Sequence, residues 1–293
     1  MKPPVLLGTF VFAVVLALGA CSSNPAATTA TSTTAASTGA LAAMTAAPIG
    51  DAEAAADASA TFPPGREGTL LAYGRDIMTK TPTVMKGYVT AGMSCEACHI
   101  NAGTKAHATS LIGAAARFPQ WNKRAKRYIL LQDRLAECFL YSENGRPPAY
   151  NSREMIALAA YVTSLSNGAK IGGKGFPGQA LVAFGPDHTA DPHAGQTVYA
   201  QKCLACHGAS GQGGGGGYYP PLWGAKSFNN GAGMHRLATM AEFVRYNMPW
   251  GGPPNVLSAQ EAYDVSAYVL SHERPHFDKT RLVSFPAVEA DKI

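Results

Sequence analysis

The sequence predicts an all-α protein built from two related helical domains in tandem. Of its 293 residues, 46% are hydrophobic and 15% are charged, which is too apolar for a disordered chain and too weakly charged for a coiled coil. A Cys-x-x-Cys-His motif occurs twice, and similar apolar segments follow both copies at similar distances. Both closing segments open with a helix-capping pattern, so two domains of one kind are expected.

The two motifs are of the type that attaches haem c covalently. They are Cys95-Glu96-Ala97-Cys98-His99 and Cys203-Leu204-Ala205-Cys206-His207. Two thiols three positions apart reach the two vinyl groups of one haem, and the adjacent His binds the iron. A single Cys-x-x-Cys is also typical of a redox dithiol or of half a zinc site, but two copies with the trailing His favour haem. We therefore expect two covalent haem c groups, attached through Cys95, Cys98, Cys203 and Cys206, with His99 and His207 as proximal iron ligands.

The segments that follow the motifs correspond in the two halves. Leu111-Ile112-Gly113-Ala114 matches Leu222-Trp223-Gly224-Ala225, and Ala160-Tyr161-Val162 matches Ala267-Tyr268-Val269. This arrangement resembles the cytochrome c fold twice over.

The last helix of each half is predicted from a capping pattern. The patterns are Asn151-Ser152-Arg153-Glu154 and Ser258-Ala259-Gln260-Glu261. Behind the first cap, apolar residues recur with helical spacing and are expected to face a haem core; they are Met155, Leu158, Val162 and Leu165.

The N-terminal sequence is typical of an export signal. Lys2 precedes an apolar run that ends at Cys21, too short to span a bilayer, and Leu18-Gly19-Ala20-Cys21 resembles the bacterial lipobox. An uncleaved signal anchor and an ordinary signal cut nearby are the alternatives. We expect residues 1–20 to be a signal peptide, Cys21 to be lipidated, and the mature protein to be periplasmic, anchored to a membrane face.

Composition divides the rest of the chain. Residues 21–61 are mostly Ala, Thr and Ser, which bury little apolar surface, so a flexible tether is expected. Residues 62–170 are predicted to form the N-terminal haem c domain and residues 191–293 the C-terminal one. The segment between them, residues 171–190, is rich in Gly and Pro and is predicted to be a linker.

The sixth iron ligand of the second haem is expected to be Met248. It stands in Asn247-Met248-Pro249, which resembles the loop that delivers the axial Met in cytochromes c. Met/His ligation raises the haem potential. Met234, His235 and Met240 are the competing residues. On the other side of this haem, Pro220-Pro221-Leu222 resembles the segment whose Pro carbonyl accepts the N–H of the proximal His.

The first half has Cys138 in the equivalent slot. An isolated Cys is usually a buried, inert residue, and a disulfide is the other alternative, but Cys21 and the four haem cysteines leave it no partner. Its position favours ligation of the first haem. A thiolate stabilises ferric iron and so lowers the potential.

Positive charge is concentrated in the first half. Residues 62–170 carry 14 Lys and Arg against 7 Asp and Glu, whereas residues 171–293 carry nine of each. Much of the excess shortly precedes Cys138: Arg117, Lys123, Arg124, Lys126, Arg127 and Arg134. A solvated face or a nucleic-acid surface would look similar, but nucleic acid is not an expected partner outside the cytoplasm. A basic pocket beside a low-potential haem suits a small anion.

The chain resembles the dihaem thiosulfate dehydrogenases, a family that includes tetrathionate reductases. The resemblance covers residues 66–275, through Ser94-Cys95 to His99, Phe118-Pro119-Gln120-Trp121, Arg134, Cys138-Phe139, Ser142, Asn144-Gly145-Arg146 and Asn247-Met248-Pro249. It implies oxidation of two thiosulfates to tetrathionate, or the reverse. Electrons would pass from the Cys/His haem to the Met/His haem and on to an external acceptor, such as a small cytochrome c or a high-potential iron–sulfur protein.

The resemblance also implies roles for individual residues. Cys138 would be the axial thiolate and a catalytic residue, and the anion pocket would be lined by Arg124, Arg134 and Ser142. Tyr141 and Glu143 depart from the basic and apolar residues expected there.

Two alternative functions are also consistent with two haem-attachment motifs. A plain dihaem electron carrier would be expected to have two Met ligands. A Sox-type sulfur-oxidation cytochrome also uses Cys/His ligation, but the second haem motif with its Met is a poorer match to that class.

Overall fold

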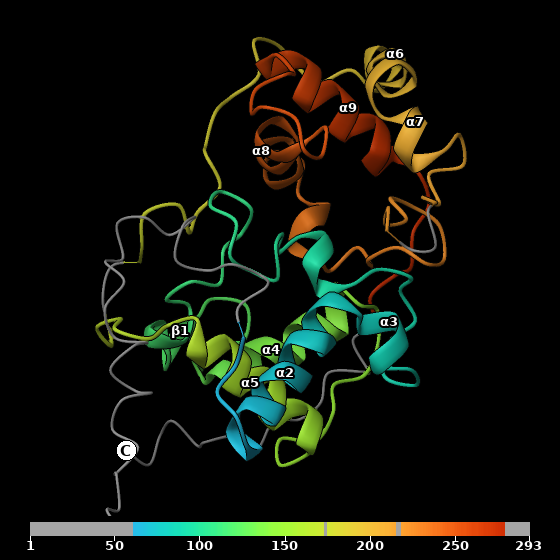
Figure 1. Ribbon diagram of the computed structural model, residues 1–293. Helices are drawn as coiled ribbons and strands as arrows, with labels where there is room; N and C mark the ends of the chain where they lie inside the picture. The colour runs from blue at the N-terminus through green and yellow to red at the C-terminus, as the bar shows by residue number, and fades with distance from the viewer. Residues whose placement is uncertain (1–60, 173–174, 215–217, 279–293) are drawn as a thin grey trace, which may run out of the picture. The chain divides into compact units, whose positions relative to one another are not determined.

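The computed structural model describes residues 61–172, 175–214 and 218–278 (Figure 1). The predicted signal peptide, Cys21 and almost all of the tether lie outside these residues. The described part is mainly helical, as predicted, with four α-helices in each half. They are α2 (Arg66–Thr79), α3 (Thr81–Val84), α4 (Leu131–Tyr141) and α5 (Arg153–Ser164), then α6 (Pro192–Lys202), α7 (Leu204–His207), α8 (Leu237–Asn247) and α9 (Ala259–Ser271). Three 3-10 turns are η1 (Cys95–Ala97), η2 (Ala115–Arg117) and η4 (Gly233–His235).

None of the helices within the described ranges is long and apolar enough to cross a membrane.

The basic run before α4 forms a β-hairpin that the sequence did not predict. Strand β1 (Gln120–Asn122) pairs antiparallel with β2 (Arg127–Ile129), so that Trp121 lies opposite Tyr128. The two rings meet edge to face, with 5.6 Å between their centroids. Because both strands have only three residues, alternation of apolar and polar side chains was too brief to reveal them.

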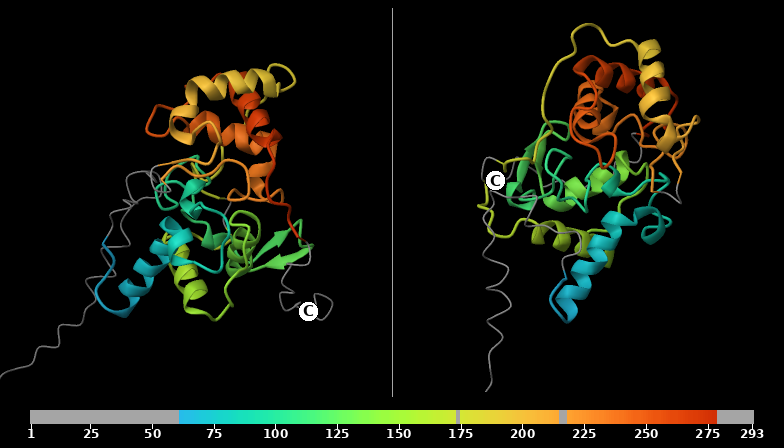
Figure 2. Two further views of the ribbon diagram at one scale, coloured as in Figure 1. Left: turned by 90° about the vertical axis from the view of Figure 1, so that its right-hand side faces the viewer. Right: turned by 45° about the horizontal axis from the view of Figure 1, so that its top comes forward.

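Each half is organised around one crossing of its first and last long helices. Helix α2 packs on α5, and α6 packs on α9; the first pair lies side by side in both views of Figure 2. A glycine stands at each crossing. A Cβ atom on Gly74 would collide with the Ala157 carbonyl oxygen, and one on Gly195 with that of Asp264. The same close approach of two backbones is therefore built into both halves.

Alanine at Gly74 is expected to lower the free energy of unfolding by about 1–3 kcal/mol, because the helices must move apart to accept the methyl group. Urea unfolding of the haem-loaded protein measures the loss. Gly185→Ala is the matched control, since nothing lies within 4 Å of a Cβ atom at Gly185. Equal stability of the two variants would contradict the tight crossing.

The predicted apolar face of α5 lies in the core. Met155, Leu158 and Val162 are buried, and Leu165 is partly buried against them, whereas Ile156 is 46% exposed. The cap is one residue later than the start of its pattern: the Ser152 hydroxyl accepts a hydrogen bond from the backbone N–H of Met155, at 3.2 Å.

The cap of α9 is formed as predicted. The Ser258 hydroxyl accepts from the N–H of Glu261 at 3.1 Å, and the Glu261 carboxylate accepts from the N–H of Ser258 at 2.8 Å.

A buried carboxylate fixes the start of α4. Asp133 is 4% exposed; it accepts hydrogen bonds from the Leu130 N–H at 2.7 Å and from the Tyr150 hydroxyl, and it pairs with Arg127 at 3.2 Å. Burial alone would raise the pKa of Asp133, but these hydrogen bonds outweigh it and hold that pKa below its ordinary value. The interaction thus stabilises the fold above the pKa of an unfolded aspartate, and the effect is lost as the pH falls through the lowered pKa.

Asp133→Asn is expected to cost about 1–3 kcal/mol of unfolding free energy at neutral pH, since hydrogen bonds to a charged group are lost. The difference from the unsubstituted protein should shrink as the solution is acidified. Urea unfolding across a pH series tests this. Asp76→Asn, which removes an exposed pair with Lys80, should change stability by less than about 0.5 kcal/mol at any pH.

Candidate active site

The first haem motif presents an oriented, neutral histidine. Cys95 begins the turn η1, and His99 Nδ1 lies 2.6 Å from the Thr109 carbonyl oxygen, which leaves Nε2 for iron. The Thr109 hydroxyl donates to the Cys98 carbonyl at 2.8 Å and so ties this loop back to the motif. Burial lowers the pKa of His99 to about 4, although the Thr109 hydrogen bond opposes it. The neutral imidazole that results is the form that binds metal.

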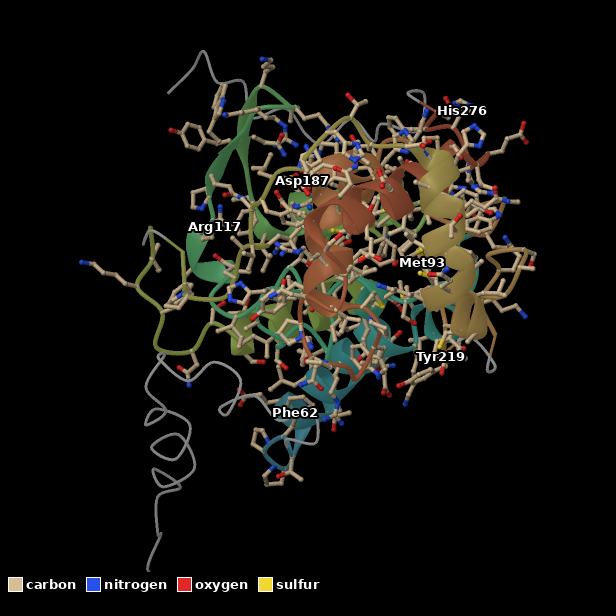
Figure 3. The ribbon with its side chains drawn as sticks, turned by 90° about the horizontal axis from the view of Figure 1, so that it is seen from above. Phe62, Met93, Arg117, Asp187, Tyr219 and His276 are labelled. Atoms are coloured by element: carbon tan, nitrogen blue, oxygen red, sulfur yellow. The ribbon has the colours of Figure 1, made fainter. Side chains whose placement is uncertain are left out.

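The second motif repeats this arrangement on α7. His207 Nδ1 lies 3.3 Å from the Pro220 carbonyl oxygen, within the Pro220-Pro221-Leu222 segment that the sequence indicated. Burial lowers the pKa of His207, and the Pro220 hydrogen bond opposes the shift. The ring of Tyr219, labelled in Figure 3, lies with its centroid 6.2 Å from that of His207. Both donor sets therefore fit haem c.

Thr109 is a functional residue that sequence reasoning missed. It precedes Leu111 by two residues, as Pro220 precedes Leu222. The matched segments could therefore have located Thr109, but the sequence has no proline there to mark the carbonyl.

Helix α4 carries three predicted site residues in one row. Arg134, Cys138 and Ser142 are spaced four residues apart, which places them on one face of the helix and its C-terminal cap. The Ser142 N–H donates to the Cys138 carbonyl at 2.9 Å, so the helical geometry continues to Ser142. The structure thus brings these three residues together.

Arg134 and Cys138 interact electrostatically. Burial raises the pKa of the Cys138 thiol, and the neighbouring Arg134 guanidinium acts to lower it. The pKa of Arg134 is in turn raised, first by Cys138 and also by Glu137, whose Oε2 lies 3.1 Å from Arg134 Nη1. The Arg134 side chain is 48% exposed, which leaves donors for an anion from solution.

Arg124 reaches the same helix from the hairpin, but at its C-terminal end. Its Nη2 donates to the Gly231 carbonyl at 3.0 Å, and its guanidinium lies over the Tyr141 ring, 4.2 Å from the centroid. Tyr141 is the last residue of α4 and is buried. Arg124 therefore lies beside the row, held by a carbonyl and a ring, with no carboxylate among its contacts in the described residues.

Glu143 was noted only as a departure from the family pattern, and the structure shows it to be deeply buried. It is 2% exposed, and its backbone carbonyl accepts from the N–H groups of Thr90 and Ala91. Burial raises the pKa of its carboxyl to about 8. Burial therefore favours the uncharged form of the Glu143 carboxyl.

Met248 follows α8 directly. It is half-buried and packs in an apolar cluster with Phe243 and Val244 of that helix. Of its competitors, Met240 is 5% exposed in the hydrophobic core, while Met234 and His235 lie on η4. Met93, labelled in Figure 3, is another core residue at 5% exposure.

Two haem-attachment motifs, each with a histidine oriented by a backbone carbonyl in its own helical half, define a dihaem c-type cytochrome with two covalently bound haem c groups. Residues 86–171 match the SoxA/TsdA cytochrome c domain family, and residues 192–273 match the cytochrome c family. The thiosulfate dehydrogenase of Allochromatium vinosum is 39% identical over 234 residues, which are 76% of this chain and 84% of that protein. The chain belongs to the thiosulfate dehydrogenase family and is an oxidoreductase.

Two further thiosulfate dehydrogenases are similar to this chain. The thiosulfate dehydrogenase of Stutzerimonas stutzeri is 41% identical over 75% of each chain. A solved structure of thiosulfate dehydrogenase (TsdBA) from Marichromatium purpuratum is 33% identical, with a TM-score of 0.70. That match covers 74% of this chain and about half, 49%, of the solved one. The L-cysteine S-thiosulfotransferase subunit SoxA of Pseudaminobacter salicylatoxidans matches at 29% identity over only 28% of this chain.

Proposed function

We propose that the protein joins two thiosulfate ions into tetrathionate at the first haem domain, residues 62–170. The observation that carries the proposal is the row of Arg134, Cys138 and Ser142 on one face of α4. A guanidinium, a soft sulfur and a hydroxyl within two helical turns match the charge and the two kinds of donor that a sulfur oxyanion requires.

The reaction balances without protons. A bond forms between the terminal sulfur atoms of two thiosulfate dianions, one tetrathionate dianion results, and two electrons leave. The principal obstacle for the protein is repulsion between two dianions. Arg134 in the first half of α4 and Arg124 at its C-terminal end would supply positive charge, which lowers that repulsion and raises the local anion concentration.

Each residue has a role that its surroundings support. Arg134 is oriented by Glu137, whose other oxygen accepts from the Asn122 amide at 2.8 Å, and it would bind the sulfonate oxygens. The Ser142 hydroxyl, which makes no hydrogen bond to a described residue, would donate to the same group. Cys138 would place its sulfur against the terminal sulfur of thiosulfate. The bound haems would supply one-electron acceptors, with Cys138 and His99 on one iron and Met248 and His207 on the other.

The predicted signal peptide, residues 1–20, gives the cellular location that we propose for the enzyme. Export and lipidation at Cys21 would hold the enzyme on the periplasmic side of a membrane, within reach of a soluble acceptor such as a small cytochrome c or a high-potential iron–sulfur protein.

Steady-state oxidation of thiosulfate by the purified dihaem protein, with an artificial acceptor, tests the proposal. We expect one tetrathionate for every two thiosulfates consumed. Absence of turnover in both directions, with both haems present, would instead indicate an electron carrier. Turnover that requires an added partner subunit and a carrier-bound thiosulfate would indicate a Sox-type cytochrome.

A further inference from the structure

The loop between His99 and Thr109 has an unusual backbone. Seven described residues other than glycine have a positive φ, and four of them lie in this loop: Asn101, Ala102, His107 and Thr109, at 51–57°. Each such residue costs about 1–2 kcal/mol relative to a right-handed conformation. Such backbone conformations persist where surrounding residues hold the chain in them. The contacts of the loop therefore show which residues hold it.

His107 is held by contacts on four sides. Its N–H donates to the Gly178 carbonyl at 2.6 Å, and its Nδ1 lies 3.0 Å from the Ala180 carbonyl oxygen. Its ring meets the Tyr246 ring edge to face, at 4.6 Å between centroids. Its own carbonyl accepts from the Asn247 amide at 2.9 Å. Two of these contacts come from the segment that precedes α6 and two from the end of α8.

Asn247 uses both of its amide hydrogens here. The side chain is 3% exposed, and Nδ2 donates to the Phe243 carbonyl at 3.0 Å as well as to His107. The first bond lies within α8, and the second connects residues 140 positions apart. A buried amide with both donors satisfied has one defined orientation, so Asn247 fixes the end of α8 relative to the His107 loop.

The residue after Asn247 is Met248, and it packs against the same loop. Ile100 and Ala108 are buried, at 2% and below, in one apolar cluster with Phe243, and Met248 and Val244 pack onto it. Ile100 directly follows His99, and Ala108 directly precedes Thr109, whose carbonyl orients His99. The proximal loop of the first haem and the Met segment of the second therefore share one packed junction.

We infer that Asn247 is a positioning residue for the sixth ligand of the second haem, acting through its hydrogen bond to His107. The junction holds Met248 in place against the loop that orients His99. Two iron ligands, one from each domain, are thereby connected through a short series of bonds: His99 to Thr109, along the chain to His107, across to Asn247, and on to Met248. This inference rests on the proposed ligand roles of His99 and Met248.

Asn247→Leu in the full-length dihaem protein tests the inference. Leucine has a similar volume but donates no hydrogen bond, so the His107 carbonyl loses its partner. We expect weakening of the long-wavelength absorption band that marks Met-ligated ferric haem, together with a lower reduction potential of the second haem. Tyr246→Phe keeps the aromatic contact with His107 and is the adjacent control; both signals should be unchanged.

A second variant tests the inference in case Asn247→Leu does not fold. His107→Gly accepts the positive φ and keeps the carbonyl, but removes the ring and its contacts with Ala180 and Tyr246. Without these contacts the carbonyl that accepts from Asn247 is no longer held in place, so the potential of the second haem should shift in the same direction, although His107 belongs to the first domain. An unchanged band and potential in either variant, when it retains its haem content, would overturn the inference. Both signals are read without thiosulfate, so failure of the proposed reaction would be recognised separately.

Discussion

Replacing Cys138 with glycine is expected to lower the turnover number for thiosulfate oxidation by about a hundredfold or more, because the variant loses the thiolate that we propose as an iron ligand, and losses at outer-sphere partners alone cost 10–100-fold. The four haem-attachment cysteines are untouched, so haem content should stay at two per chain. Turnover with an artificial acceptor measures the loss. Lys123→Gly, on the exposed hairpin that precedes α4, is the control for a general effect of substitution and should keep its turnover.

The same position should control the redox potential. If Cys138 is the proposed thiolate ligand, Cys138→Met replaces it with a thioether, which no longer stabilises ferric iron, so the potential of the first haem should rise. A redox titration that follows both haems would show one shifted and one unshifted component. Full turnover in the glycine variant, or an unshifted potential in the methionine variant, would remove Cys138 from the site.

Arg134→Leu is expected to lower kcat/KM for thiosulfate by a factor of about 30 to several thousand, the 2–5 kcal/mol typical of a truncated charge pair that binds a charged ligand. Part of this cost is indirect, since Glu137 would be left buried without its cation. The double variant Arg134→Leu with Glu137→Leu separates the two contributions, because it removes both charges. We expect the double variant to remain defective.

Salt dependence gives an independent readout of the same cation. The unsubstituted enzyme should lose kcat/KM as ionic strength rises, because salt screens the attraction between Arg134 and the dianion. Arg134→Leu should show a weaker dependence. Lys126→Leu, an exposed cation at the hairpin turn, should retain nearly the normal value. A double variant restored to normal kcat/KM would show that Arg134 acts only by neutralising Glu137.

The two haem-attachment motifs could be located from the sequence, because their signals are local, and the residues proposed for the active site were chosen at the same stage. The motif at Cys95 and its copy at Cys203 fix both haem sites, and equivalent spacing to Met248 drew attention to Cys138. Arg134 and Ser142 were named only through the family resemblance, and their position with Cys138 on one face of α4 was recognised in the structure. Periodicity likewise identified the buried face of α5.

What the sequence did not show depends on contacts between distant segments. The β1–β2 hairpin is too short to have a pattern of its own. The carbonyl of Thr109 performs the task of the Pro220 carbonyl without a proline to mark it. The Asn247 contact joins residues 140 positions apart, and nothing in either local sequence indicates it. Arg124 was expected in the pocket, but its contact with Tyr141 could be found only once the hairpin had been placed.

Electron paramagnetic resonance of the ferric protein, with and without thiosulfate, tests the central claim most directly. We predict two low-spin signals, one with the narrow spread of g values typical of thiolate ligation and one of a Met/His haem, and we predict that thiosulfate perturbs only the first. Cys138→Met should lack the thiolate signal. A spectrum with no thiolate signal, or a thiosulfate effect confined to the Met/His haem, would contradict an active site built on Cys138.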